Sequence, residues 1–113
     1  MWKRTGEWVL CDCGDFFLDI DEYRNGEDQM IFCHVRYNVW TKASFKESAR
    51  VFRTFRAAVD CPLYVIGDEG DRKFARFVAH FGFKPLSSIH CTDGKRRLLY
   101  VSFKENVVLK HVQ

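Results

Sequence analysis

The chain of 113 residues lacks the features that mark multidomain, fibrous or membrane-spanning proteins. Only two prolines occur, Pro62 and Pro85, and no linker, repeat or low-complexity tract divides the sequence. No apolar run approaches the roughly 18 residues that span a bilayer. Residues 1–6 also lack the apolar segment of a signal peptide. We therefore expect a single domain over residues 1–113 that stays in the cytoplasm and has no membrane partner.

The cysteines follow neither a disulfide pattern nor a zinc pattern. The five are Cys11, Cys13, Cys33, Cys61 and Cys91. An odd number without a secretion signal argues against a disulfide framework. The spacing lacks the two C-x₂₋₄-C pairs typical of structural zinc, even with the histidines beside Cys33 and Cys91. Each cysteine lies in an apolar, strand-like run, where a thiol packs as a small hydrophobe. We predict free thiols and no metal site.

The composition is that of a globular domain with an aromatic core. Hydrophobic residues make up 47% and aromatic residues 16%, with eleven phenylalanines. We expect Trp2, Trp8 and Trp40 to pack rather than to stack on nucleic-acid bases. The net charge of +3 is mildly basic. It allows a phosphate-bearing ligand or a nucleic acid without requiring either.

Two apolar periods alternate along the chain. A period of two, as in Phe16, Leu18 and Ile20, predicts strands, and Asn25-Gly26 is typical of a hairpin turn. The expected strands are 8–13, 16–23, 30–40, 61–67, 87–92 and 97–103, with one more short strand in the tail 104–113.

A helical period appears twice. The first stripe comprises Phe45, Ala49, Phe52, Phe55 and Val59, and the second comprises Phe74, Phe77, Val78 and Phe81. We predict a helix over 44–59 that is capped by Ser44 with Glu47 as its capping-box partner. A second helix follows Asp71 and stops at Gly82. We expect Phe52, Phe55, Phe74, Phe77 and Phe81 to be mostly buried.

The resulting order is β-β-β-α-β-α-β-β. A strand-helix-strand unit implies a right-handed crossover between parallel strands, and the flanking hairpins imply antiparallel neighbours. We therefore predict an α/β fold of the α+β type with a mixed sheet. Val35 should lie on a central strand parallel to the strand that holds Val65.

This order, with a helix ending in Gly82-Phe83-Lys84-Pro85 before a hairpin with Asp93-Gly94, resembles the GNAT (GCN5-related N-acetyltransferase) superfamily. The resemblance covers about residues 15–103, and the short chain is similar to the reduced acetyltransferase-like proteins of tailed phages. It implies a single GNAT-like domain that transfers an acyl group from acetyl-CoA to an acceptor amine. In the family the amine attacks the thioester directly, and backbone N–H groups polarise its carbonyl.

The resemblance also implies a cofactor site. The family's phosphate-binding motif, Q/R-x-x-G-x-G/A, lies between the central strand and the first core helix. The matching window gives the cofactor-binding residues Thr41, Lys42, Ala43, Ser44, Phe45 and Lys46. No glycine occurs there, so a Cβ on every residue hinders close approach to a pyrophosphate. We predict that coenzyme A binding is weak or absent, with Lys42, Lys46 and the helix start supplying positive potential.

The catalytic residues remain unassigned. The tyrosine that serves many family members as general acid is matched by Val78, and the usual helix-opening asparagine by Asp71. Asp19 and Asp21 are candidate bases by position, or else ordinary solvated strand carboxylates. The four histidines show no spacing typical of a triad, and we predict none of them to be catalytic.

A non-catalytic reading stays open. Lys46, Arg50 and Arg53 share one helix face, and Arg72 and Arg76 share another. Such faces are either ordinary solvated surfaces or contacts for phosphate or an acidic partner. The alternative function is therefore a GNAT-derived module of a phage or its host that binds a protein or a nucleic acid through these basic faces.

Overall fold

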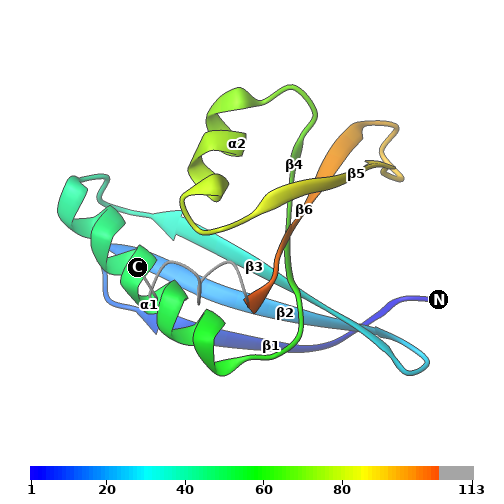
Figure 1. Ribbon diagram of the computed structural model, residues 1–113, viewed down its shortest axis with the longest axis horizontal. Helices are drawn as coiled ribbons and strands as arrows, with labels where there is room; N and C mark the ends of the chain where they lie inside the picture. Colours follow the sequence, from blue (N-terminus) through cyan, green and yellow to red (C-terminus); the bar gives the residue numbers. More distant parts are fainter. Residues whose placement is uncertain (105–113) are drawn as a thin grey trace.

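The computed structural model describes residues 1–104 and has the predicted order of eight elements (Figure 1). The strands are β1 (Lys3–Asp12), β2 (Phe16–Asn25), β3 (Asp28–Tyr37), β4 (Leu63–Asp68), β5 (Lys84–His90) and β6 (Arg96–Ser102). The helices are α1 (Lys42–Ala58) and α2 (Arg72–Ala79). The strand predicted in the tail falls, from residue 105 on, outside the described residues.

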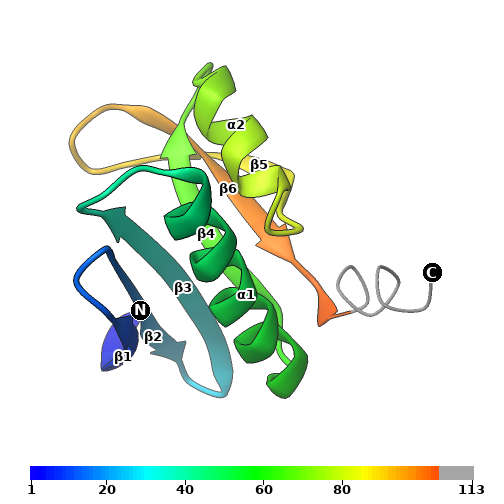
Figure 2. The same cartoon turned by 90° about the vertical axis from the view of Figure 1, so that its left-hand side faces the viewer.

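The fold is of the α+β type, with a mixed six-stranded sheet in the order β1-β2-β3-β4-β6-β5. Its neighbours pair antiparallel except for β3 and β4, which are parallel. The predicted mixed sheet is confirmed, as is the parallel relation between the strands of Val35 and Val65. Both helical crossovers, β3-α1-β4 and β4-α2-β5, move the same way along the sheet, so right-handed connections place both helices on one face (Figure 2).

The β2–β3 hairpin sets which side chains face the helices. Asn25 pairs with Asp28 across the two-residue loop, and Gly26 supplies the required positive φ of 64°. Alternation from this point buries Leu18 and Ile20 beneath the helices. The carboxylates of β2 therefore point to the opposite face. The next strand out, β1, pairs with β2 less regularly, with register shifts after Arg4 and after Val9.

The parallel pairing of β3 with β4 is very short. Only Ile31 with Leu63 and Phe32 with Tyr64 are paired. Beyond these residues β3 runs on to Tyr37 beside β2, while β4 continues beside β6. The two strands therefore separate toward their carboxyl ends, as their ribbons show in Figure 2.

The start of α1 corrects the predicted cap. Thr41 is the N-cap, and its Oγ1 accepts from the Ser44 N–H at 3.1 Å, while Ser44 Oγ accepts from the Thr41 N–H at 2.9 Å. Ser44 thus occupies the third helical position, and Glu47 pairs with Arg50 instead. Threonine and serine are both good helix caps, so the cap lies three residues earlier than predicted, where Thr41 and Ser44 close a capping box together.

The second helix follows the prediction more closely. Asp71 caps α2 by accepting from the Phe74 N–H at 3.0 Å. The Phe74 ring then lies over Gly67 of β4, where an added Cβ would be 2.2 Å from it. The helix ends at Ala79, and Gly82, with φ 90°, turns the chain into β5.

A buried arginine holds the far end of α1. Arg56 is fully buried and donates to three carbonyl oxygens, those of Ser102 at 2.7 Å, Val59 at 2.7 Å and Cys61 at 2.6 Å. These bonds join the helix end to the entry of β4 and the exit of β6. They lie next to the short stretch where β3 and β4 are still paired.

The core expectations hold in part. Phe52 and Phe81 are buried, whereas Phe55, Phe74 and Phe77 are only partly buried at its margin. The expectation that the tryptophans are packed is wrong, since Trp2, Trp8 and Trp40 are 42%, 49% and 64% exposed. They lie at strand ends and on the edge strand, where few elements cover them. Neither helix of the described residues is long and apolar enough to span a bilayer.

We predict that Phe52→Ala lowers the free energy of unfolding by about 3–5 kcal/mol, because the ring is 1% exposed and packs between Phe81 and Phe83. Urea unfolding followed by circular dichroism measures this change. Leu86→Ala, at a side chain 55% exposed, is the control and should change stability by less than about 0.5 kcal/mol. Equal effects for the two variants would contradict the described core.

Candidate ligand-binding site

The separation of β3 and β4 opens a cavity of about 710 Å³, called here the interstrand cavity. Strand β3 lines it with Cys33, His34, Val35 and Tyr37, and β4 lines it with Val65 and Ile66. These residues directly follow the last paired positions. The lining is mainly apolar and reaches both faces of the sheet, since Val65 is on the helix side and His34 on the other.

Aromatic rings close the helix side of this cavity. The Tyr37 ring lies 4.8 Å from Trp40 and 6.0 Å from Phe77, and Phe77 lies 5.1 Å from Phe81. These centroid distances are those of interacting aromatic pairs. The rings therefore connect the end of β3 to α2 and fix the width of the opening.

A second cavity of about 780 Å³, called here the interhelical cavity, lies between the start of α1 and α2. Three cationic side chains line it: Lys42, Lys46 and Arg76. Trp40 and Phe77 line both cavities, so the two share an aromatic wall. Both cavities are mainly apolar, and the interhelical one also carries the three cationic side chains.

The structure distributes the predicted cofactor residues unevenly. Thr41, Lys42, Phe45 and Lys46 line the interhelical cavity. Ser44 is buried within the capping box, and Ala43 is exposed on the first turn without lining this cavity. The cap uses the Ser44 amide, which leaves the amides of Lys42 and Ala43 in the first turn for an anion.

Phe45 has a clear packing role where the family motif has a small residue. Its ring lies 5.9 Å from Trp40, 6.0 Å from Phe77 and 5.7 Å from both His80 and Phe81. The bulk of Phe45 thus holds α1 against α2. Arg76 and His80 complete this region, and their spacing of four on α2 is the sequence signal that could have linked them to it.

The opposite end of the interstrand cavity is polar. His34 Nε2 lies 3.0 Å from Asp21 Oδ2, and both residues line the cavity. Asp21 also accepts from Arg4 at 2.9 Å. The sequence singled out Asp21 but missed His34, because the pairing depends on the register between β2 and β3.

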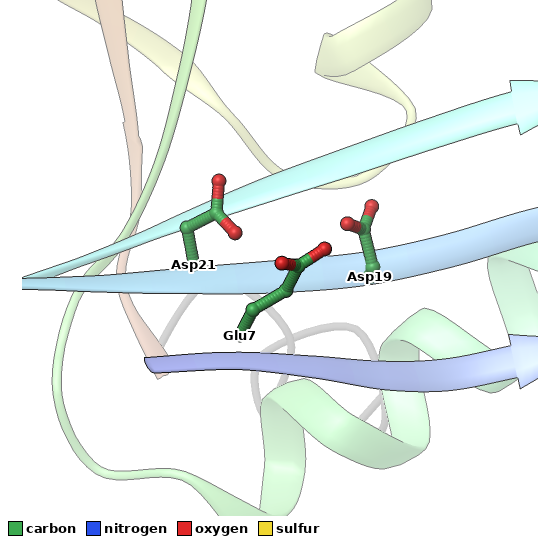
Figure 3. Close-up of side chains that lie close together, drawn as sticks. All are labelled: Glu7, Asp19 and Asp21. Atoms are coloured by element: carbon green, nitrogen blue, oxygen red, sulfur yellow. The ribbon is translucent and has the colours of Figure 1, made fainter. Parts of the chain in front are cut away.

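A carboxylate cluster adjoins this end (Figure 3). Within residues 1–104, Glu7, Asp19 and Asp21 bring one oxygen each to within 4.8 Å of one another. Arg4 already contacts two of these carboxylates, those of Glu7 and Asp21. The cluster therefore gives this face a negative field that one guanidinium only partly offsets.

Val78, which the sequence resemblance matches to a general-acid tyrosine, offers no proton donor. Val78 is 3% exposed and presents an apolar wall to the interstrand cavity. Nearby, Tyr37 and Ser48 are linked through their hydroxyls at 2.6 Å, and Ser48 also donates to the Phe45 carbonyl at 2.8 Å. Burial raises the pKa of Tyr37, which stays protonated at neutral pH.

No family model matches the chain, and a search of curated proteins finds no match either. A function for the chain therefore has to be argued from its own residues.

We predict that Cys33 resists alkylation in the folded protein, since burial raises the pKa of its thiol to about 12. Iodoacetamide at pH 8 followed by peptide mass spectrometry should label the exposed Cys13 and spare Cys33. Because the unfolded thiol ionises near its ordinary pKa of 9.0 and the buried thiol only near about 12, the free energy of unfolding should fall as the pH rises from 9.0 toward about 12. Equal labelling of both thiols in the folded protein would contradict the burial of Cys33.

Proposed function

We propose that the chain is a GNAT-like domain that binds an acyl-coenzyme A and transfers its acyl group to an amine. The observation that carries the proposal is the pair of adjoining cavities. One lies at the start of α1, where three cationic side chains accompany an aromatic wall, and the other is apolar and lies between separated parallel strands. In sheets of this kind, ligands bind at the carboxyl ends of parallel strands, where the strands part.

The chemical parts of coenzyme A match the two cavities in turn. Its phosphates suit the cations of Lys42, Lys46 and Arg76, and its adenine suits the exposed ring of Trp40. The pantetheine arm is narrow, extended and carries two amides. Beyond Phe32 and Tyr64 the facing edges of β3 and β4 have no ladder partner in each other, so their backbone groups can pair with such an arm.

The expected affinity for coenzyme A depends on the backbone N–H groups and cations at the start of α1. A glycine-rich loop would aim several N–H groups at the pyrophosphate, whereas here the capping box takes one of them. The helix dipole adds only about 0.3–1 kcal/mol, and exposed lysines add little in water. We therefore expect weaker binding than a glycine-bearing loop gives, with Lys42 and Lys46 carrying much of it.

Transfer requires little from side chains. The acceptor nitrogen attacks the thioester carbonyl carbon directly, and free backbone N–H groups along the separated strands can stabilise the oxyanion. Positioning in a confined apolar cavity supplies much of the remaining acceleration. A chain without the family tyrosine can thus still support the reaction.

A second candidate is a non-catalytic module for single-stranded nucleic acid. The observation that favours it is Trp40, 64% exposed beside Lys42 and Lys46, since a base can stack on such a ring while phosphates contact the lysines. The predicted basic stripe of α1 is weaker than its sequence indicated, because Arg50 is paired with Glu47.

We predict that acetyl-CoA binds the protein measurably in calorimetry at low ionic strength, and that Lys42→Glu with Lys46→Glu weakens it at least about tenfold, equivalent to about 1.4 kcal/mol. Reversing two charges removes the attraction to phosphate and adds repulsion. The matched control is Lys3→Glu with Lys95→Glu, which makes the same charge change at exposed sites outside both cavities.

The outcomes separate the two candidates. Binding of acetyl-CoA that only the α1 pair weakens supports the acyl-CoA site. An absence of heat at millimolar acetyl-CoA, together with Lys42- and Lys46-dependent binding of a labelled oligothymidylate in fluorescence anisotropy, would favour the nucleic-acid module instead.

A further inference from the structure

The lining of the interstrand cavity extends to the sheet face opposite the helices, and this end of the cavity is called here the sheet-face mouth. Trp2, Asp21, Tyr23, Phe32 and His34 line it there. This mouth differs from the cationic side in charge, because the nearby carboxylates outnumber the one guanidinium. A ligand that enters at this end would contact a second ligand that occupies the apolar part of the cavity from the helix side.

We propose that His34, held by Asp21, is the proton acceptor for a primary amine that enters the interstrand cavity through this mouth. The proposal rests on the proposed function and names the acceptor class of that site, an alkylammonium ion flanked by an apolar or aromatic group. His34 is the catalytic residue in this scheme, and Asp21 is a positioning residue.

The hydrogen bond between the two residues decides which imidazole nitrogen is free. A carboxylate can only accept, so the 3.0 Å contact requires that Nε2 carries the proton and donates to Asp21 Oδ2. In the neutral imidazole, Nδ1 then keeps its lone pair and can take a proton. Asp21 is itself fixed, because Arg4 donates to its other oxygen at 2.9 Å and its side chain is only 14% exposed.

The other titratable groups that line the cavity are less suited to this step. Burial raises the pKa of Cys33 to about 12 and also raises the pKa of Tyr37, whose hydroxyl contacts Ser48. The ring of Tyr23 packs edge-on against Phe32, with 5.5 Å between the ring centroids. Imidazole is the side chain that exchanges protons near neutrality.

The charges around His34 favour the approach of an ammonium ion. On β1, Arg4 and Glu7 lie near Asp21, and on β2, Asp19 adds a further carboxylate. Arg36, the next residue of β3 on this face, stacks over Phe17 at 5.1 Å instead of contacting the cluster. The net negative charge of these groups attracts an ammonium ion toward His34.

The aromatic rings near this mouth indicate which group the acceptor amine carries beside its ammonium ion. Phe32 lies 5.9 Å from Tyr64, next to the Tyr23 pair, so a row of rings leads from the mouth across the sheet. Aromatic faces attract cations and cover apolar groups. A primary ammonium with a neighbouring aromatic group fits both features.

The step balances without a further reactant. One ammonium proton passes to His34 Nδ1, and the amine nitrogen then attacks the thioester carbonyl carbon. The C–N bond forms and the C–S bond breaks, and the thiolate leaves with the electron pair. The second nitrogen proton goes by way of solvent to the thiolate, and His34 afterwards returns its proton to water.

The test uses acetyl-CoA with phenethylamine as the acceptor probe, and NMR detection of N-acetylphenethylamine. The wild type should form this product. His34→Gln should lower the rate about 100-fold or more, because it deletes the proton acceptor. Acetyl-CoA affinity should change less than about twofold, since His34 is on the far side from the lysines. His90→Gln, at an exposed histidine of β5, is the matched control and should behave as the wild type.

A second measurement determines the tautomer of His34 in the absence of catalysis. Long-range proton–nitrogen spectra of the full chain should show the tautomer with hydrogen on Nε2 and a shift of the His34 signals on phenethylamine addition. Asp21→Asn should reduce both effects, since an amide no longer acts only as an acceptor. The other tautomer, together with no response to phenethylamine, would overturn the assignment of this mouth.

The remaining outcomes distinguish the inference from the proposed function. If acetyl-CoA binds and His34→Gln keeps the wild-type rate, the inference fails and the acyl-CoA site stands. Binding of acetyl-CoA without acetylation of phenethylamine, spermidine or a lysine peptide by the wild type overturns the inference and the transfer step of the proposed function, and leaves the acyl-CoA binding site. If acetyl-CoA does not bind at all, the proposed function fails and the role of His34 fails with it.

Discussion

The arrangement of both cavities depends on the short parallel pairing between β3 and β4. A longer ladder would close the sheet and leave no interstrand cavity, and no pairing at all would leave the two halves of the sheet unconnected. The paired stretch at Ile31 and Phe32 is supported from one side by Arg56, which bonds the end of α1 to Cys61 and Ser102. At the open end, aromatic rings from α1 and α2 maintain the separation. The opening thus results from two opposed constraints, each built from specific side chains.

Most of the fold could be predicted from the sequence, because each element carries its own local signal. The alternation of Phe16, Leu18 and Ile20 places β2, and the stripe through Phe52 places α1. The mixed sheet then follows from connection rules that hold across proteins. The start of α1 could not be predicted from the sequence, because Thr41 and Ser44 are both suitable N-cap residues and lie three residues apart. The choice between them depends on the reciprocal hydrogen bonds of the capping box.

The candidate site was predictable only where its residues adjoin one another in the chain. The window 41–46 was found because it follows a strand and opens a helix. The contact between Asp21 and His34 is instead a diagonal pair across two strands, and it needs the exact two-residue loop that sets Asn25 opposite Asp28. The exposure of Trp40 depends on where α2 ends up, which is a tertiary outcome that no local pattern carries.

The irregular pairing of β1 has a consequence for the protein at high concentration. As the outer strand of the sheet, β1 presents a row of backbone donors and acceptors, flanked by the half-exposed side chains of Trp8 and Val9. A regular edge of this kind would template the addition of strands from other molecules. The register shifts after Arg4 and after Val9 increase the local twist and interrupt the even spacing of that row. A second chain can therefore form backbone hydrogen bonds with only short stretches of β1. The irregular edge strand thus protects the protein from aggregation by strand addition.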